Sequence, residues 1–213
     1  MKITIVYDNE ARKVGLRQGH GFSALIEDTG LSPLLFDTGA DGSVLLHNMR
    51  ELNVNPREIS IIVISHAHGD HTGGLSEILG INRIAKIYIP SSFKKSFPGR
   101  KVTVVKSPVR IRENIFSTGE LEGVEQSLAL KTDNGIFVLT GCAHPGIGNI
   151  FSAAVKFGRL YGIAGGFHGF HKFDAFRGLS LICPCHCTVH KQEIRDLFRN
   201  ETLECGAGVV IEL

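Results

Sequence analysis

The sequence predicts a layered α/β sandwich that forms one domain over residues 1–213. The length of the chain and its 43% content of hydrophobic residues allow one large core. Short β-branched segments alternate with segments of helical periodicity, in two strand-rich halves that each contain helices. Sheets and amphipathic helices bury their apolar faces against one another as layers, so this pattern favours a sandwich.

The first half is expected to consist of short strands separated by helices. The strands are apolar, β-branched runs at residues 2–8, 23–28, 33–39, 59–65 and 85–90. A helix is expected at residues 43–52, where apolar residues recur at helical spacing and Asp41 is available as the N-cap. A shorter helix follows at residues 73–80.

The second half is expected to begin with strands, which dominate residues 101–140. The last third then alternates between the two kinds of element. Helices are expected near 146–157 and at 189–199, and strands at 159–167, 179–184 and 208–213.

The charge pattern narrows the classes of partner. Lys and Arg total 23 against 21 Asp and Glu, and no block of like charges indicates a nucleic-acid partner. No run of 18 uncharged apolar residues indicates a membrane span, and "MKITIVYDNE" turns acidic where a signal peptide would stay apolar. We therefore expect a cytoplasmic protein with neither a nucleic-acid nor a membrane partner.

The five cysteines do not suggest a disulfide framework, because three of them alternate within "CPCHC". In an extended chain Cys183, Cys185 and Cys187 would point to the face opposite His186. A zinc knuckle normally uses C-x-x-C spacing, so we expect thiols packed in the core.

A metal site is indicated by "SHAHGDHTGG" at residues 65–74. His66 and His68 are two residues apart after a strand, so their side chains would point to the same side. Gly69 permits a turn into a helix, from which Asp70 and His71 would project towards the same cavity. Imidazole and carboxylate donors suit zinc, with manganese and iron as alternatives.

Two further strand ends offer donors, because "VLTGCAHPGIGN" carries Cys142 and His144 and "ICPCHCT" carries His186. Sites in α/β folds lie at the carboxyl ends of strands, and we therefore expect these residues at the same site.

Taken together, "FDTG" at 36–39, "SHAHGDHTGG" and the late histidine resemble the metallo-β-lactamase superfamily. The resemblance implies a four-layer αββα sandwich with a one- or two-metal site at one edge of the sheets. It assigns His66 and His68 to the first metal and Asp70, His71 and His186 to the second. Asp37 would support the ligand loop without binding metal.

One stretch departs from the superfamily pattern, since "TGCAH" stands where an aspartate of "TGD" usually bridges the metals. His144 then completes the first site. The bridging ligand stays open between Cys142 and Glu125, and Cys142 as a packed thiol is an equal alternative.

A narrower resemblance rests on "HGFS" (20–23), "TGCAHPGIGNI" (140–150), "GGFH" (165–168) and "PCHCT" (184–188). These stretches resemble the dihydropterin ribofuranosylaminobenzene-phosphate synthase-like proteins. That subgroup is associated with methanopterin-type cofactor assembly, and many of its members are described as metal-dependent hydrolases.

The expected activity is that of a dinuclear metal-dependent hydrolase acting on a small, phosphorylated molecule through a phosphoester or ester bond. Two divalent cations would lower the pKa of a shared water to about 7. Asp70 would accept its proton, and His168 would donate one to the leaving oxygen, with His20 as a weaker candidate for that role. The alternatives are a methanopterin-pathway synthase-like enzyme, a di-iron oxidoreductase, and a non-catalytic metal-binding or ligand-sensing protein.

Overall fold

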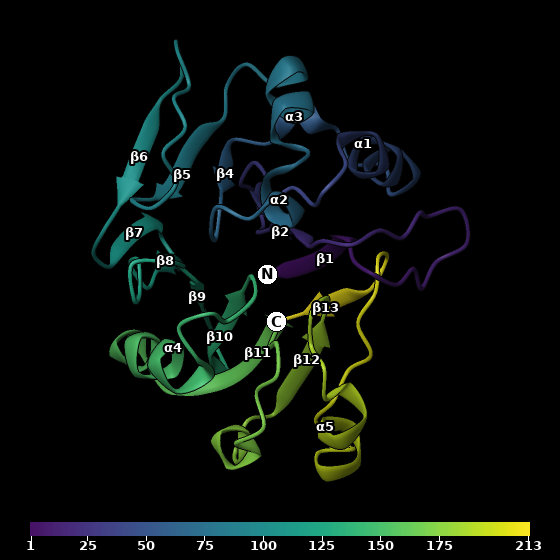
Figure 1. Cartoon of the computed structure of the whole chain (residues 1–213), viewed down its shortest axis with the longest axis vertical. Coiled ribbons are helices and arrows are strands. Elements are labelled where there is room, and N and C mark those ends of the chain that lie inside the picture. Colours follow the sequence, from purple (N-terminus) through teal and green to yellow (C-terminus); the bar gives the residue numbers. More distant parts are fainter.

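The computed structural model describes residues 1–213 and contains two β-sheets, each covered by helices on one face (Figure 1). The first sheet has the strand order β13-β1-β2-β3-β4-β5-β6. Its strands are β1 (Lys2–Tyr7), β2 (Ser23–Glu27), β3 (Leu34–Phe36), β4 (Ile61–Val63), β5 (Lys86–Pro90), β6 (Val102–Val105) and β13 (Val210–Glu212).

The second sheet has the order β12-β11-β10-β9-β8-β7. Its strands are β7 (Val109–Arg112), β8 (Ile115–Ser117), β9 (Leu128–Thr132), β10 (Gly135–Thr140), β11 (Leu160–Gly166) and β12 (Leu181–Cys185). In each sheet a parallel block, β3 to β6 in the first and β10 to β12 in the second, brings carboxyl ends of strands to one edge.

The helices are short. They are α1 (Gly42–Glu51), α2 (Gly69–Thr72), α3 (Leu75–Ile81), α4 (Ile147–Ala154) and α5 (Lys191–Leu197), with 3-10 turns at Pro56–Glu58, Val155–Phe157 and Phe173–Phe176. Asp41 accepts hydrogen bonds from the backbone N–H groups of Ser43 and Val44, so the N-cap predicted for α1 is confirmed. No helix has the length and apolar character that a membrane crossing requires.

Three apolar clusters define the layers. A cluster of 22 buried residues, including Phe36 and Phe137, fills the space between the sheets. A second cluster contains Leu45 of α1 and Ile78 of α3, and a third contains Ile150 of α4 together with residues of α5 and the second sheet. Figure 1 shows α1 and α3 on one side of the paired sheets and α4 and α5 on the other. The expected four-layer αββα sandwich is confirmed.

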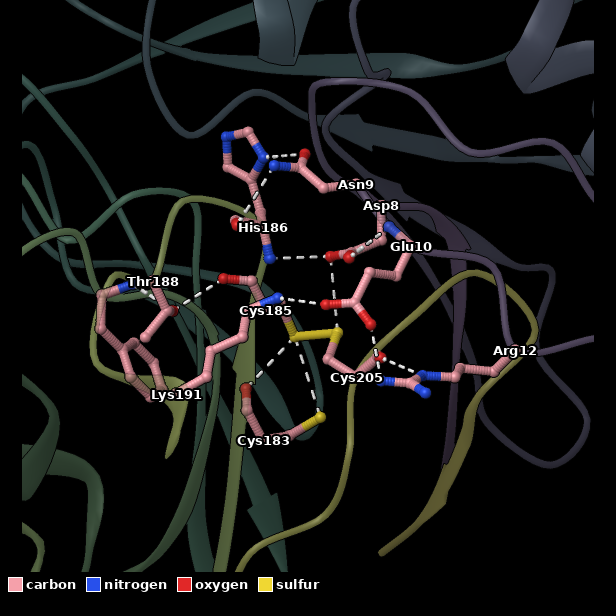
Figure 2. Close-up of a disulfide and its surroundings, with 11 residues drawn as sticks. Asp8, Asn9, Glu10, Arg12, Cys183, Cys185, His186, Thr188, Lys191 and Cys205 are labelled. Carbon is pink, nitrogen blue, oxygen red and sulfur yellow. Dashed lines mark hydrogen bonds and ion pairs between the residues drawn. A yellow bond between two sulfur atoms is a disulfide. The ribbon is translucent and has the colours of Figure 1, made fainter. Parts of the chain in front are cut away.

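The cysteines of "CPCHC" depart from the prediction in two ways. Cys185 forms a disulfide with Cys205, which ties β12 to the segment that precedes β13 (Figure 2). Cys183 is buried between the sheets as expected, but Cys187 is only partly buried and contacts Cys142. The predicted alternation fails because β12 ends at Cys185 and His186 adopts a positive φ of 44°, which turns the chain.

Candidate metal centre

The candidate centre lies where five strands end. Asp37 follows β3, residues 65–71 follow β4, residues 141–144 follow β10, His168 follows β11, and residues 186–187 follow β12. Parallel strands place their carboxyl ends at the same edge of a sheet, and the two sheets face each other across the core. Side chains distant in sequence therefore converge on one site.

The first group of donors consists of His66, Cys142 and His144, whose ligand atoms all lie within 4.8 Å of one another. The Nε2 atoms of His66 and His144 are 3.2 Å apart. The Nδ1 atom of His68 lies 3.1 Å from Nε2 of His66, so the predicted pair of histidines stands side by side.

The second group consists of Asp70, His71, Cys142 and His186, again with ligand atoms within 4.8 Å of one another. The Nε2 atom of His186 is 3.0 Å from Oδ2 of Asp70, and the Nε2 atom of His71 is 3.1 Å from Sγ of Cys142. All six residues predicted as ligands are thus brought to one place, and Cys142 belongs to both groups.

These residues fit a divalent cation. Nε2 of His66 has two other imidazole nitrogens 3.1–3.2 Å away, and a cation at this place would bind the lone pairs that converge there. Nitrogen, carboxylate oxygen and sulfur are also the donors that zinc takes in proteins.

Asp37 fixes the orientation of two of the histidines. It accepts hydrogen bonds from the backbone N–H of Ser65 (2.7 Å), from the Ser65 hydroxyl (2.6 Å) and from Nδ1 of His71 (2.7 Å). Because the Ser65 hydroxyl donates its proton to Asp37, its oxygen accepts one from Nδ1 of His66, 2.8 Å away. Both imidazoles are thereby assigned the tautomer that leaves Nε2 free for a metal.

Burial governs the protonation of these groups. It raises the pKa of Asp37 to about 7, against the opposing effects of His66 and Ser65. It lowers the pKa of His71 to about 3 and also lowers the pKa of His66. Neutral imidazoles at pH 7 keep their lone pairs available for a cation.

His186 is held by residues that the sequence did not single out. Its Nδ1 lies 2.8 Å from Oδ1 of Asn9, and its backbone N–H donates to Oδ2 of the buried Asp8 at 2.8 Å (Figure 2). The Asn9 side chain also donates to the carbonyl oxygen of His186. These contacts support a backbone conformation that is unfavourable for a residue other than glycine.

Glu125 has a different place from the bridging position that was considered for it. It is fully buried, and its Oε1 accepts hydrogen bonds from the Thr140 hydroxyl and from the backbone N–H groups of residues 141, 142 and 143. Its Oε2 accepts from the N–H of His144. The carboxylate thus holds the loop that carries Cys142 and His144, and it lies outside every group of candidate ligands.

Three more side chains stand at the mouth of the centre. The exposed His20 has its Nε2 3.3 Å from Oδ2 of Asp70. The ring of His168 lies beside that of His144, tilted by 47° and with 4.6 Å between the centroids, and His168 adopts a positive φ of 45°. Cys187 lies next to Cys142. Of these, only Cys187 was not expected at the site.

Comparison with known proteins identifies the family of the chain. Residues 16–150 match the metallo-β-lactamase superfamily. The chain belongs to that superfamily. Its members bind divalent metals and are typically metal-dependent hydrolases, which agrees with the donor groups described above.

Within the metallo-β-lactamase superfamily, the chain is similar to a longer protein over most of both sequences. It is 29% identical to 7,8-dihydropterin-6-methyl-4-(beta-D-ribofuranosyl)-aminobenzene-5'-phosphate synthase of Methanocaldococcus jannaschii, over 91% of this chain and 90% of that protein. This bears out the narrower resemblance seen in the sequence.

Solved structures agree with the superfamily assignment. The structure of Tm1679, a metal-dependent hydrolase of the β-lactamase superfamily, matches with a TM-score of 0.78 and 26% identity over 100% of this chain and 99% of that one. A diphosphatase from the PhnP family matches with a TM-score of 0.68 over 100% of this chain and 97% of that one. At 10% identity this second likeness concerns the fold alone.

Proposed function

We propose that this member of the superfamily is a dinuclear metal-dependent hydrolase that cleaves a phosphoester or ester bond of a small, phosphorylated molecule. The observation that carries the proposal is the position of Cys142, whose sulfur belongs both to the group with His66 and His144 and to the group with Asp70, His71 and His186. A donor that belongs to two neighbouring groups could bridge a pair of adjacent cations.

The residues divide between two cations. His66, His68 and His144 would hold the first, Asp70, His71 and His186 would hold the second, and Cys142 would bridge them. We propose zinc, because sulfur and imidazole donors suit it. When bound, such cations supply Lewis acidity and lower the pKa of a water molecule to about 7.

Proton transfer is proposed for Asp70 and His168. The hydrogen bond from His186 holds the pKa of Asp70 well below its usual range, so its carboxylate stays ionised at neutral pH and could accept a hydrogen bond from the attacking water. His168 lies across the site beside His144, where its imidazole would donate a proton to the leaving oxygen. The exposed imidazole of His20 lies close to the same carboxylate oxygen of Asp70 that His186 contacts, and it is a weaker candidate for the proton donor.

A groove next to the centre offers room for the rest of the substrate. It has a volume of about 400 Å³ and lies between residues 145–149, which follow His144, and residues 169–175, which follow His168. The exposed Lys172 at its rim has no ion-pair partner. Small-molecule sites are commonly of this size, and the unpaired ammonium group of Lys172 supports an anionic substrate.

The test combines metal analysis with turnover. Protein purified without added metal is expected to contain about two zinc ions per chain and to hydrolyse bis(p-nitrophenyl) phosphate, with the activity lost on chelation. His68→Ala should abolish turnover. His47→Ala is the matched control, because that half-buried histidine lies on α1 and forms its hydrogen bonds with Gly15 and Arg50, away from the candidate ligands. Undiminished turnover in His68→Ala, or in fully chelated protein, would refute the proposal.

A second candidate is a synthase-like reaction, which the 29% identity to the Methanocaldococcus jannaschii protein favours. In that case the centre would join a pterin to an aminobenzene that carries ribose phosphate. Incubation of the zinc-loaded protein with ribofuranosylaminobenzene phosphate and a dihydropterin whose 6-methyl group carries a diphosphate as leaving group, followed by mass spectrometry, would detect the joined product and the released diphosphate. Hydrolysis of bis(p-nitrophenyl) phosphate without any such product would leave the hydrolase as the better description.

A further inference from the structure

Cys187 lies at the candidate metal centre, although its place in "CPCHC" predicts a thiol packed in the core. Its Sγ is 3.4 Å from Sγ of Cys142, and together with His168 the two cysteines form a third group of donors within 4.8 Å of one another. Cys187 is partly exposed, unlike the buried Cys183.

The surrounding backbone makes room for this sulfur. A Cβ atom added to Gly166, the last residue of β11, would lie only 2.5 Å from Sγ of Cys187. The turn that presents Cys187 is fixed by Thr188, whose hydroxyl donates to the carbonyl oxygen of Cys185 at 2.7 Å and accepts from the N–H of Phe167 at 3.0 Å. The position of Cys187 is therefore set by both neighbouring strand ends.

The other cysteines have different environments. Cys185 and Cys205 are joined to each other, and Cys183 packs between the sheets. Cys142 and Cys187 are the two free thiols at the centre. In a tetrahedral zinc site with sulfur about 2.3 Å from the metal, two thiolates lie roughly 3.8 Å apart, so a small movement would let both bind one cation.

We propose that Cys187 supplies a second thiolate to the metal centre beside Cys142, and that the centre consequently selects a thiophilic cation such as zinc over manganese or magnesium. The inference rests on the metal centre of the proposed function but concerns a residue that this function does not require. Soft thiolate donors favour zinc, whereas carboxylate and water suit magnesium and manganese.

Cobalt(II) gives a direct test, because a thiolate bound to this ion produces a sulfur-to-metal charge-transfer band in the near ultraviolet. The purified protein is stripped of metal, titrated with cobalt(II) and followed by absorption. Cys187→Ser is expected to lower the band by about a third, since the bond from Cys187 is lost and Cys142 would keep its bonds to both ions. Cys183→Ser is the matched control, with the band unchanged.

A second measurement uses the wild-type chain and therefore tests the inference even if Cys187→Ser does not fold. In the wild-type chain, zinc is expected to protect Cys187 from alkylation by iodoacetamide, as judged by peptide mass spectrometry. A band of full intensity in folded Cys187→Ser, or alkylation of Cys187 at the same rate with and without zinc, would overturn the inference and leave the metal centre standing. Absence of any cobalt uptake by the wild-type chain would overturn both.

Discussion

Replacing Glu125 with glutamine is expected to destabilise the protein by about 4 kcal/mol, although the substitution changes only one atom of a side chain. Glu125 is buried, and its two oxygens accept five hydrogen bonds from the Thr140 hydroxyl and the loop N–H groups of residues 141–144. In the variant, the amide group would face either the N–H of His144 or the other donors, and donors do not bond to each other.

The expected destabilisation is calculated for the amide orientation that loses fewer hydrogen bonds. With the amide oxygen kept at the position of Oε1, the bond from the His144 N–H is lost, and a hydrogen bond to a charged group contributes about 1.5–3 kcal/mol. A buried donor left without an acceptor costs about 1–3 kcal/mol more. A chain of this size should then melt roughly 8–16 °C lower.

The assay is urea unfolding of the metal-free protein, so that metal binding does not add to the stability. Glu122→Gln is the control, because Glu122 is exposed three residues away, and a change below about 0.5 kcal/mol is expected for it. A loss below about 1 kcal/mol in Glu125→Gln would show that the carboxylate does not organise the loop.

Three other outcomes are expected. Asp70→Asn and His68→Ala should each abolish turnover with unchanged far-ultraviolet circular dichroism, because both residues lie at the rim, and unfolding of both variants would contradict this placement. Asn9→Ala should weaken zinc binding about 10- to 100-fold in a competition titration, since Asn9 orients His186, and wild-type affinity would refute that role. Cys205→Ser should lower the free energy of unfolding by about 3 kcal/mol in oxidising buffer, because it removes a disulfide between cysteines 20 residues apart. Equal stability of the variant and the wild type in that buffer would argue against the disulfide.

The strands and the ligand loops could be predicted because they depend on local patterns. Alternation and β-branching locate β1 to β5. The rule that sites lie at the carboxyl ends of strands is sufficient to predict that His144 and His186 lie near "SHAHGDHTGG". The role expected for Asp37 depends on the same logic, since β3 and β4 are parallel neighbours and Ser65 lies two residues after the end of β4.

The remaining features depend on contacts between segments that are far apart in the sequence. The partner of Cys185 is 20 residues away, and a spacing rule within "CPCHC" cannot indicate it. Asp8 and Asn9 follow β1 of the first sheet, and they reach His186 only because the facing sheets bring the end of β1 close to the end of β12. Acidic residues are also mostly exposed, so nothing in "GVEQSL" marks Glu125 as buried.

The position of Cys187 shows how one backbone angle can reverse a prediction. Alternation holds for Cys183 and Cys185 within β12, and both pack between the sheets. At His186 the φ angle is 44°, so the next side chain no longer returns to the core face and instead meets Cys142. A positive φ at a histidine is uncommon, and the sequence alone gives no sign of it.

The most direct test of the central claim, a pair of cations bridged by Cys142, is elemental mass spectrometry of the wild-type chain and of Cys142→Ala, both purified without added metal. We expect about two zinc ions per chain in the wild type and clearly fewer in the variant, because both donor groups lose the atom that they share. A wild-type chain without metal, or a variant that retains both ions, would contradict the claim.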